Sequence, residues 1–262
     1  MIANFPGKEL LLDPGLNRFH KLYIAVFGVP ISGLRIRLRR ILPAISGKYE
    51  RILDLGCGRG IFTFELARRF PNAQVIGIDI DKKQIDINNE IAQQIGLKNV
   101  TFRVQDILTM EYKNAFDLIL SVDNLEHISE DSEVLRKIDE ALIFGGSFVC
   151  HVPAYERIWL LWGKSKNFDV EGHVRPGYHI EQLKKLIEEA GLHIKSINPT
   201  YGYLETVSNN ISYLITGARQ RNALLYAFAF PMLNAMAWMG RNAKPGVRGA
   251  GILTIASKKV CP

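Results

Sequence analysis

The stretch Arg51-Ile-Leu-Asp-Leu-Gly-Cys-Gly-Arg-Gly60 joins a short aliphatic run to a segment with helical apolar spacing, Phe62–Phe70. It predicts a buried strand, a turn built on Gly56, Gly58 and Gly60, and a helix directly after the turn. Glycine lets a ligand approach the backbone closely, and the free N–H groups of a helix N-terminus attract polar groups. A dinucleotide-binding turn would need one more glycine at position 61, which is Ile here, so we expect a binding loop of another kind.

Outward from this turn, β-rich runs alternate with helical patterns. A helix that starts at Asp81 carries Gln84 as a capping-box partner, and Gly191 closes an amphipathic helix. The alternation predicts right-handed βαβ crossovers and an α/β fold with a doubly wound, Rossmann-like, mostly parallel sheet. The predicted strands are Arg51–Leu55, Gln74–Asp79, Asn99–Val104, Phe116–Ser121, Ser147–Val152, His193–Asn198 and Gly251–Ser257, and further helices are predicted at Asp131–Ile143 and His179–Ala190.

Two acids follow successive predicted strands. Asp79 closes the second strand and Asp106 follows the third. Ligands of open α/β sheets bind at the carboxyl ends of the strands, where these acids and the glycine turn would meet. Asp79 is placed to accept both hydroxyls of a ribose, and Asp106 to accept an amino group of a purine. The alternative is that both acids only cap helices or hold turns.

Five short motifs follow one another in order within residues 50–155: Asp54-x-Gly56-x-Gly58-x-Gly60, Gly77-x-Asp79, Gln105-Asp106, Phe116-Asp-Leu-Ile119 and Phe144-Gly-Gly146. Together they resemble the motifs of class I S-adenosylmethionine-dependent methyltransferases. The resemblance implies a seven-stranded sheet with an antiparallel last strand, S-adenosylmethionine as the cofactor, Asp79 on its ribose, Asp106 on its adenine and Ser121 beside its sulfonium. The implied cofactor-binding residues are Asp54, Leu55, Gly56, Cys57, Gly58, Gly60, Asp79, Ile80, Gln105, Asp106, Ile107 and Ser121.

Catalytic candidates lie in the segment after the fourth predicted strand. His127 is the best candidate for a general base, because histidine titrates near neutrality, and Glu126 precedes it. The alternative is a His127 that only holds its loop. Asp123, Glu126 and His127 also resemble the acid-x-x-Glu-His segment with which ubiquinone-biosynthesis O-methyltransferases hold a divalent cation. Because Leu-Glu-His-Ile segments also occur in relatives without a metal, the sequence prediction is that no metal is bound.

A second group of candidates lies between the fifth predicted strand and the amphipathic helix. His173 and Arg175 could face the methyl acceptor and bind an anionic or phenolic oxygen. The segment from Gly172 to Tyr178 resembles a Gly-His-x-Arg-x-x-Tyr motif of small-molecule methyltransferases. Alternatively, Arg175 pairs with Asp169 and holds the loop in place.

The net charge of +7 belongs to the two ends of the chain. Residues 1–50 carry +5, residues 201–262 carry +6 and residues 51–200 carry −4. Both ends are also apolar, at residues 22–31 and at residues 223–239, and basic charge beside apolar surface is typical of contact with an anionic membrane face. Nucleic acid is the alternative partner for the basic residues. It is not expected, because the basic ends of the chain are apolar and residues 51–200 are acidic.

Residues 223–239 are too short to span a bilayer comfortably, since seventeen helical residues reach about 25 Å and the hydrocarbon core is ~30 Å thick. Pro231 interrupts their middle. We therefore expect a helical hairpin that dips into a surface or covers the substrate, with a buried core helix as the alternative. Three dispersed cysteines and no signal peptide favour a cytoplasmic protein, peripheral on a membrane.

The expected division of the chain is a helical lid or membrane-facing segment at 1–47, a cofactor-binding domain at 48–200 plus 249–262, and an apolar helical insertion at 201–248. Three apolar regions would build the acceptor pocket, which indicates methyl transfer to a hydrophobic or lipid-like molecule. An RNA or protein methyltransferase and a non-catalytic, membrane-docked scaffold are the alternatives, and the oligomeric state stays open. The aromatic and aliphatic residues concerned are Tyr23, Phe27, Ile31, Tyr155, Ile158, Trp159, Trp162, Tyr226, Phe228, Phe230 and Trp238.

Overall fold

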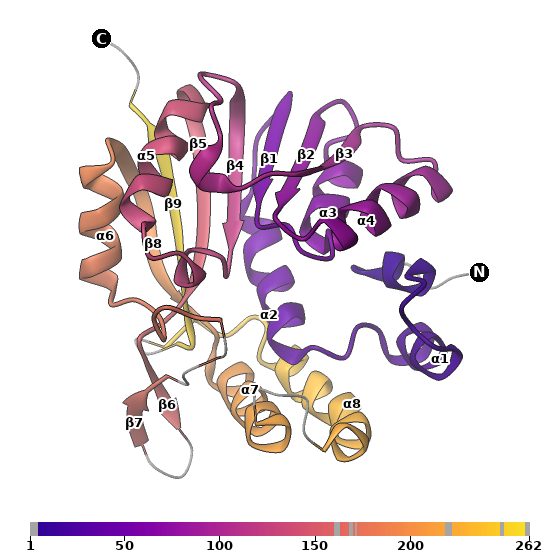
Figure 1. Ribbon diagram of the computed structural model, residues 1–262. Helices are drawn as coiled ribbons and strands as arrows, with labels where there is room; N and C mark the ends of the chain where they lie inside the picture. The colour runs from indigo at the N-terminus through magenta and orange to yellow at the C-terminus, as the bar shows by residue number, and fades with distance from the viewer. Residues whose placement is uncertain are drawn as a thin grey trace.

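The centre of the molecule is a seven-stranded sheet with the order β3-β2-β1-β4-β5-β9-β8 (Figure 1). The computed structural model describes residues 5–159, 163–167, 170, 172–217, 222–246 and 249–259. Strands β1 to β5 pair in parallel, whereas β9 runs antiparallel to both β5 and β8. The doubly wound, mostly parallel sheet with an antiparallel last strand is therefore confirmed. The strands are β1 (Arg51–Leu55), β2 (Gln74–Asp79), β3 (Val100–Val104), β4 (Phe116–Val122), β5 (Leu142–Pro153), β8 (Leu192–Thr200) and β9 (Gly251–Lys258).

Helices cover both faces of the sheet and make two hydrophobic cores. The core on one face contains residues of α2 (Ser32–Ile41), α3 (Ile61–Arg69) and α4 (Lys82–Gln94). The core on the other face contains residues of α5 (Asp131–Ala141) and α6 (Ile180–Glu189). Because β1 is covered on both sides, its residues after Arg51 are all buried. Short 3-10 helices η1 (Lys8–Leu12), η2 (Leu42–Ala44), η3 (Ile107–Thr109) and η4 (Leu125–His127) complete this part of the fold.

Strand β5 starts earlier than the sequence pattern predicted. Helix α5 ends at Ala141 rather than at the predicted Ile143, and the chain enters the sheet at Leu142. The pairing register with β4 shifts between Phe116 and Leu118. A side chain at Gly146 would come within 2.9 Å of the Ile143 carbonyl oxygen, so glycine permits this close backbone approach. The structure also contains a small hairpin, β6 (Glu156–Trp159) and β7 (Gly163–Lys166), which was not predicted.

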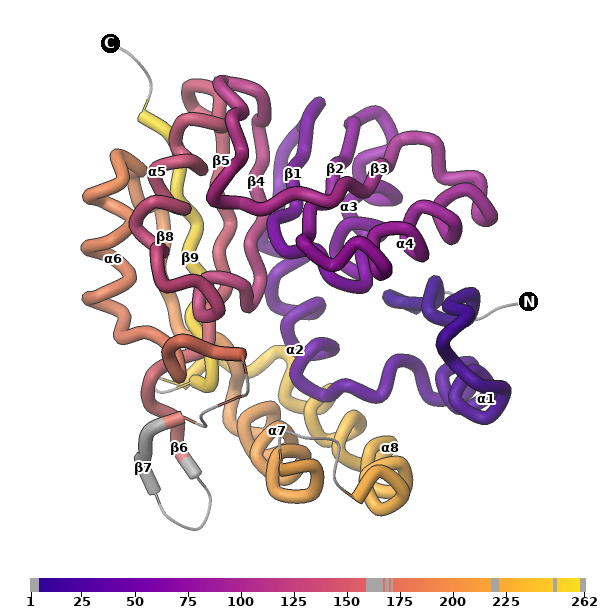
Figure 2. The backbone as a smooth tube through the Cα atoms, viewed as in Figure 1, coloured from indigo at the N-terminus to yellow at the C-terminus, as the bar shows by residue number. Residues whose placement is uncertain are grey.

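Four helices lie at the end of the molecule toward which the parallel strands point: α1 (Arg18–Phe27), α2, α7 (Tyr203–Thr216) and α8 (Ala223–Met239) (Figure 2). Arg40 of α2 donates to the fully buried carboxylate of Glu205 on α7, at 3.0 and 2.6 Å, and so ties the N-terminal segment to the insertion. Among the described helices, none combines the length and apolarity needed to cross a membrane. The division of the chain into three parts stays a prediction.

The hairpin expected within residues 223–239 is wrong, because α8 continues as one helix through Pro231. Proline has no N–H, so the carbonyl four residues earlier, that of Ala227, receives no helical hydrogen bond from it. The hydroxyl of Tyr23 on α1 donates to this carbonyl at 2.6 Å. A side chain of another helix thus supplies the hydrogen bond that the Ala227 carbonyl lacks within α8. The hairpin in the structure is formed by α7 and α8.

Candidate active site

The glycine turn after β1 has the backbone geometry of a binding loop. Gly56, Gly58 and Gly60 have φ angles of 64°, 48° and 69°, which side-chain-bearing residues rarely adopt. A Cβ at Gly56 would come within 2.4 Å of the Asn124 side chain, whereas a Cβ at Gly58 would meet nothing within 4 Å. The turn therefore packs against the segment after β4 on one side and leaves open space over Gly58 for a ligand.

Two side chains outside the turn hold Gly58 in place. The Asp79 carboxylate accepts a hydrogen bond from the Gly58 N–H at 2.8 Å and another from the Asp81 N–H at 3.0 Å. The fully buried Asn88 of α4 donates to the Gly58 carbonyl at 2.7 Å. The sequence analysis missed Asn88. The one feature of the sequence that could have indicated it is that Asn88 is a polar residue on the inner face of an amphipathic helix.

Asp54, one of the predicted cofactor-binding residues, links the two elements that flank the glycine turn. Its buried carboxylate accepts a hydrogen bond from the Thr63 hydroxyl at 2.6 Å and so ties β1 to α3. Burial raises the pKa of Asp54 to about 7, although the Thr63 hydroxyl opposes this shift. Asp54 thus supports the glycine turn from beneath.

The other predicted cofactor residues lie along the carboxyl edge of the parallel strands. The strand register places Ser121 beside Leu55, and Asp79 beside Val104 at the end of β3. Ser121 is fully buried, and its hydroxyl has no hydrogen-bond partner among the described residues. Asp106 is exposed and caps η3 through the Leu108 N–H at 2.9 Å. Of the remaining predicted residues, Ile107 is buried, Cys57 and Gln105 are half-buried, and Ile80 is exposed.

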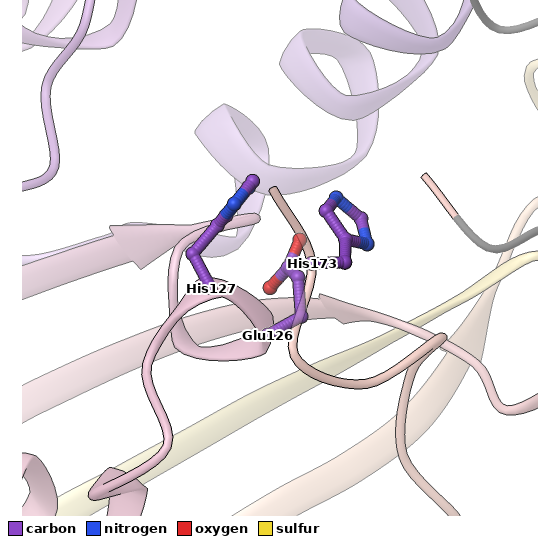
Figure 3. A group of neighbouring side chains, drawn as sticks. All are labelled: Glu126, His127 and His173. Carbon is purple, nitrogen blue, oxygen red and sulfur yellow. The ribbon is translucent and has the colours of Figure 1, made fainter. Parts of the chain in front are cut away.

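Glu126, His127 and His173 form an acid–imidazole cluster at the end of β4, with one ligating atom of each residue within 4.8 Å of the others. Figure 3 shows the Glu126 carboxylate between the two rings. The ring centroids lie 4.4 Å apart and the ring planes are nearly perpendicular, at 79°. The Glu126 carbonyl accepts from the Val174 N–H at 3.0 Å, which brings the loop that carries His173 onto η4.

Burial shifts the pKa values of two members of this cluster, Glu126 and His173. Glu126 is fully buried, and neither carboxylate oxygen has a hydrogen-bond partner in the described part of the chain. Burial and the charge of Asp123 hold the pKa of Glu126 well above its ordinary value. Burial and the neighbouring His127 lower the pKa of His173. Both shifts favour the neutral forms of Glu126 and His173. His127 Nδ1 lies 2.9 Å from the Gly172 carbonyl oxygen, so as a donor it leaves its Nε2 lone pair free.

Asp123 does not join the cluster, so the metal set Asp123, Glu126 and His127 is not assembled. Its carboxylate pairs with Arg37 of α2 at 2.8 Å and contacts Nδ1 of the buried His151 at 2.6 Å. Burial alone would raise the pKa of Asp123, but Arg37 and His151 lower it to about 2. The sequence analysis missed Arg37 and His151 here, because neither lies near Asp123 in the chain.

Arg175 holds its loop rather than presenting its guanidinium to a cavity. It donates to the Asp131 carboxylate and to the Tyr178 hydroxyl, both at 2.5 Å, and to the Leu125 carbonyl at 3.3 Å. The structure thus favours the second of the two roles considered for Arg175, with Asp131 as the partner. Asp169, the partner that was expected, lies outside the described residues.

The aromatic residues expected around an acceptor do not share one environment. Phe230 is fully buried, 6.4 Å from the Tyr23 ring, whereas Phe228 is 85% exposed on the opposite side of α8. Trp238 is also exposed. Trp162 and the side chain of Trp159 lie outside the described residues. Some of these aromatic residues therefore belong to the hydrophobic core, and others lie on the outer surface of the molecule.

Residues 46–191 match the protein family described as Methyltransferase domain. This match includes the glycine turn, the acids that follow β2 and β3, and the acid–imidazole cluster. The chain belongs to this family of class I S-adenosylmethionine-dependent methyltransferases. Helices α1, α7 and α8 lie outside the matched segment, so the family does not account for them.

Individual relatives of this methyltransferase cover different parts of it. (S)-coclaurine N-methyltransferase of Thalictrum flavum subsp. glaucum is 32% identical over 104 residues, which are 38% of this chain and 29% of that protein. Ubiquinone biosynthesis O-methyltransferase of Acinetobacter baumannii is 24% identical over 189 residues, 65% of this chain and 77% of that protein. The fold resembles phosphoethanolamine N-methyltransferase 2 of Haemonchus contortus, with a TM-score of 0.59 and 16% identity, over 94% of this chain and 61% of that one.

Proposed function

We propose that this chain transfers a methyl group from S-adenosylmethionine to an apolar, lipid-like small molecule that it reaches at a membrane surface. The observation that carries the proposal is the acid–imidazole cluster at the end of β4, in which the buried Glu126 carboxylate lies between two imidazole rings (Figure 3) and one ligating atom of each residue lies within 4.8 Å of the others. The cofactor supplies an already activated methyl group on its sulfonium. The chain's own residues must then orient the acceptor, exclude water and take up a proton where the acceptor carries one.

The residues at the sheet edge fit the cofactor. The open space over Gly58 leaves room for it beside the turn. The Asp79 carboxylate uses two of its roughly four acceptor positions locally, which leaves others for ribose hydroxyls. Asp106 is exposed and uses one oxygen on its cap, so its other oxygen is available to an adenine amino group. The buried Ser121 hydroxyl offers a polar atom near the methyl donor.

In the proposed reaction, His127 takes the acceptor's proton. Its Nδ1 donates to the Gly172 carbonyl, which fixes the tautomer and leaves Nε2 as the base. His173 packs against the ring edge-on, and Glu126 holds a proton that it can exchange within the cluster. The same donor set could hold a divalent cation instead. We assign the cluster to proton transfer because burial favours the neutral form of Glu126, and a metal needs the carboxylate.

The apolar nature of the acceptor is supported by what covers this side of the sheet. Helices α1, α2, α7 and α8 lie beyond the carboxyl ends of the parallel strands, and α8 carries only one strongly polar side chain, Asn234, among its seventeen residues. A polar acceptor would lose its hydration on binding beneath these apolar helices. Transfer of an apolar acceptor from water to the same place is favourable in free energy.

The test is incubation of the protein with methyl-labelled S-adenosylmethionine and a membrane lipid extract, followed by mass spectrometry. Label should enter an apolar component, and His127→Ala should abolish it. His193→Ala, an exposed histidine on β8, is the matched control and should retain activity. Label in RNA or protein instead of the lipid fraction would overturn the choice of acceptor. Binding of the cofactor with no label in any fraction would favour a non-catalytic scaffold.

A further inference from the structure

Helix α8 lies on the surface although it is almost entirely apolar. Only Phe230, Leu233 and Ala237 are buried. The outward stripe contains Phe228, 85% exposed, and Met232, 74% exposed, one helical turn apart. Exposed apolar residues are ordinary when isolated, but a continuous stripe along a helix marks a contact surface.

Helix α1 extends this surface. Phe19 is 83% exposed, Leu22 and Val26 are also exposed, and Ile24 is the only buried residue of α1. Tyr23 fills the seam between the helices, with its hydroxyl on the Ala227 carbonyl and its ring 6.4 Å from that of Phe230. The apolar face is defined here as Phe19, Leu22, Val26, Leu224, Phe228 and Met232.

The segments that carry the apolar face contain only positive charge at their surface. No acidic residue occurs between positions 14 and 49 or between positions 206 and 262. Arg18 and Lys21 lie on α1, and Arg241 and Lys244 follow α8. The acids that directly precede these two stretches, Asp13 and Glu205, are both buried, and Glu205 is held by Arg40. Arg219, Arg221 and Arg248, which flank the same segment in sequence, lie outside the described residues.

We propose that the apolar face docks on an anionic lipid bilayer, with the basic residues around it on the lipid headgroups. Apolar residues enter the headgroup–acyl boundary and cations contact anionic lipids, as in interfacial helices. A second copy of the chain is a poorer occupant, because symmetric pairing would bring the same cations against each other. Since the face lies at the end of the molecule that carries the glycine turn and the cluster, docking would bring the catalytic end to the membrane.

This inference rests on the proposed function only in that the methyl acceptor would be taken from the membrane. The docking itself is tested without any methyl transfer. The full-length protein is floated with vesicles of phosphatidylcholine alone or of phosphatidylcholine and phosphatidylglycerol at 3:1. Anionic lipid should raise the bound fraction at least fivefold, since one juxtamembrane cation contributes about 1 kcal/mol. High salt should reverse this gain.

The decisive variant is Phe228→Glu combined with Met232→Glu, which should lower vesicle binding at least tenfold. The matched control is Phe144→Glu, which places the same charge on an exposed residue of β5 outside the apolar face. Cofactor affinity, measured by calorimetry, should be unchanged in both proteins, and this result shows that they are folded.

Three outcomes overturn the docking: no flotation, equal flotation of the double variant and the wild type, or a stable dimer that Phe228→Glu dissolves. Methyl transfer to a detergent-solubilised acceptor tests the proposed function separately. Transfer in detergent without flotation would remove the docking and keep the enzyme. Flotation without transfer would keep the docking and remove the proposed activity.

Discussion

Replacement of Asp79 by alanine is the sharpest test of the cofactor site. The carboxylate accepts from the Gly58 N–H at 2.8 Å and from the Asp81 N–H at 3.0 Å, and its remaining lone pairs are the ones assigned to the ribose. A hydrogen bond to a charged group contributes ~1.5–3 kcal/mol. Loss of one such bond should weaken binding of S-adenosylmethionine by about 10- to 150-fold.

The same substitution has a separate cost to stability. Gly58 loses the acceptor of its N–H, which contributes on the order of 1 kcal/mol, and a domain of this size should lose about 2–4 °C in Tm. Asp79→Asn keeps an oxygen for Gly58 but removes the charge, so it should be nearly as stable as the wild type and still bind more weakly. Asp86→Ala, on the exposed side of α4 and paired with Lys82, is the control.

Calorimetric titration with S-adenosylmethionine measures the affinity and differential scanning fluorimetry measures Tm. If Asp79→Ala is folded and binds within threefold of the wild type, the carboxylate does not contact the ribose and the placement of the cofactor is wrong. If Asp79→Ala binds weakly but Asp79→Asn binds normally, the residue acts only by holding the turn.

Further predictions concern the buried acids. Glu126→Gln imitates the neutral acid, so it should keep or raise Tm at pH 7 while kcat falls at least tenfold, as measured by label transfer. Because burial raises the pKa of Asp54 to about 7, the folded state retains a proton that the unfolded state releases, and the free energy of unfolding should fall by up to roughly 4 kcal/mol between pH 4 and 7. Asp54→Asn should remove this slope in urea titrations and still accept from Thr63. Treatment with EDTA should leave activity unchanged, and a loss that Zn²⁺ restores would assign the acid–imidazole cluster to a metal.

Local patterns were enough to predict the sheet and the position of the glycine turn. Strand and helix periodicities are properties of neighbouring residues, and the connections of a parallel sheet follow from their order. The cap of α4 is a local feature of the same kind, since the Asp81 carboxylate accepts from the Gln84 N–H at 3.1 Å. The carboxyl edge of the sheet then follows from topology alone, which is why acids after β2 and β3 could be assigned to it.

Side-chain direction could not be read from the same patterns. Asp54 and Asp79 both stand at strand ends beside the turn, yet one carboxylate is buried against Thr63 and the other reaches the Gly58 N–H. Spacing also suggested that Asp123 belongs with Glu126 and His127. A partner 86 positions earlier, Arg37, removes it from that set, because its carboxylate pairs with Arg37 and contacts His151.

The arrangement of α8 illustrates why the apolar segments were hardest to interpret. Proline in the middle of a helical pattern argues for a break, because a carbonyl one turn earlier loses its donor. That cost disappears when another part of the chain supplies the donor, as Tyr23 does for Ala227. The same hydrogen bond that satisfies the Ala227 carbonyl also joins α1 to α8, and both helices carry exposed apolar residues. A local irregularity in the sequence is thus compensated by a tertiary contact, which sets α1 beside the helix whose exposed apolar residues we propose dock on the bilayer.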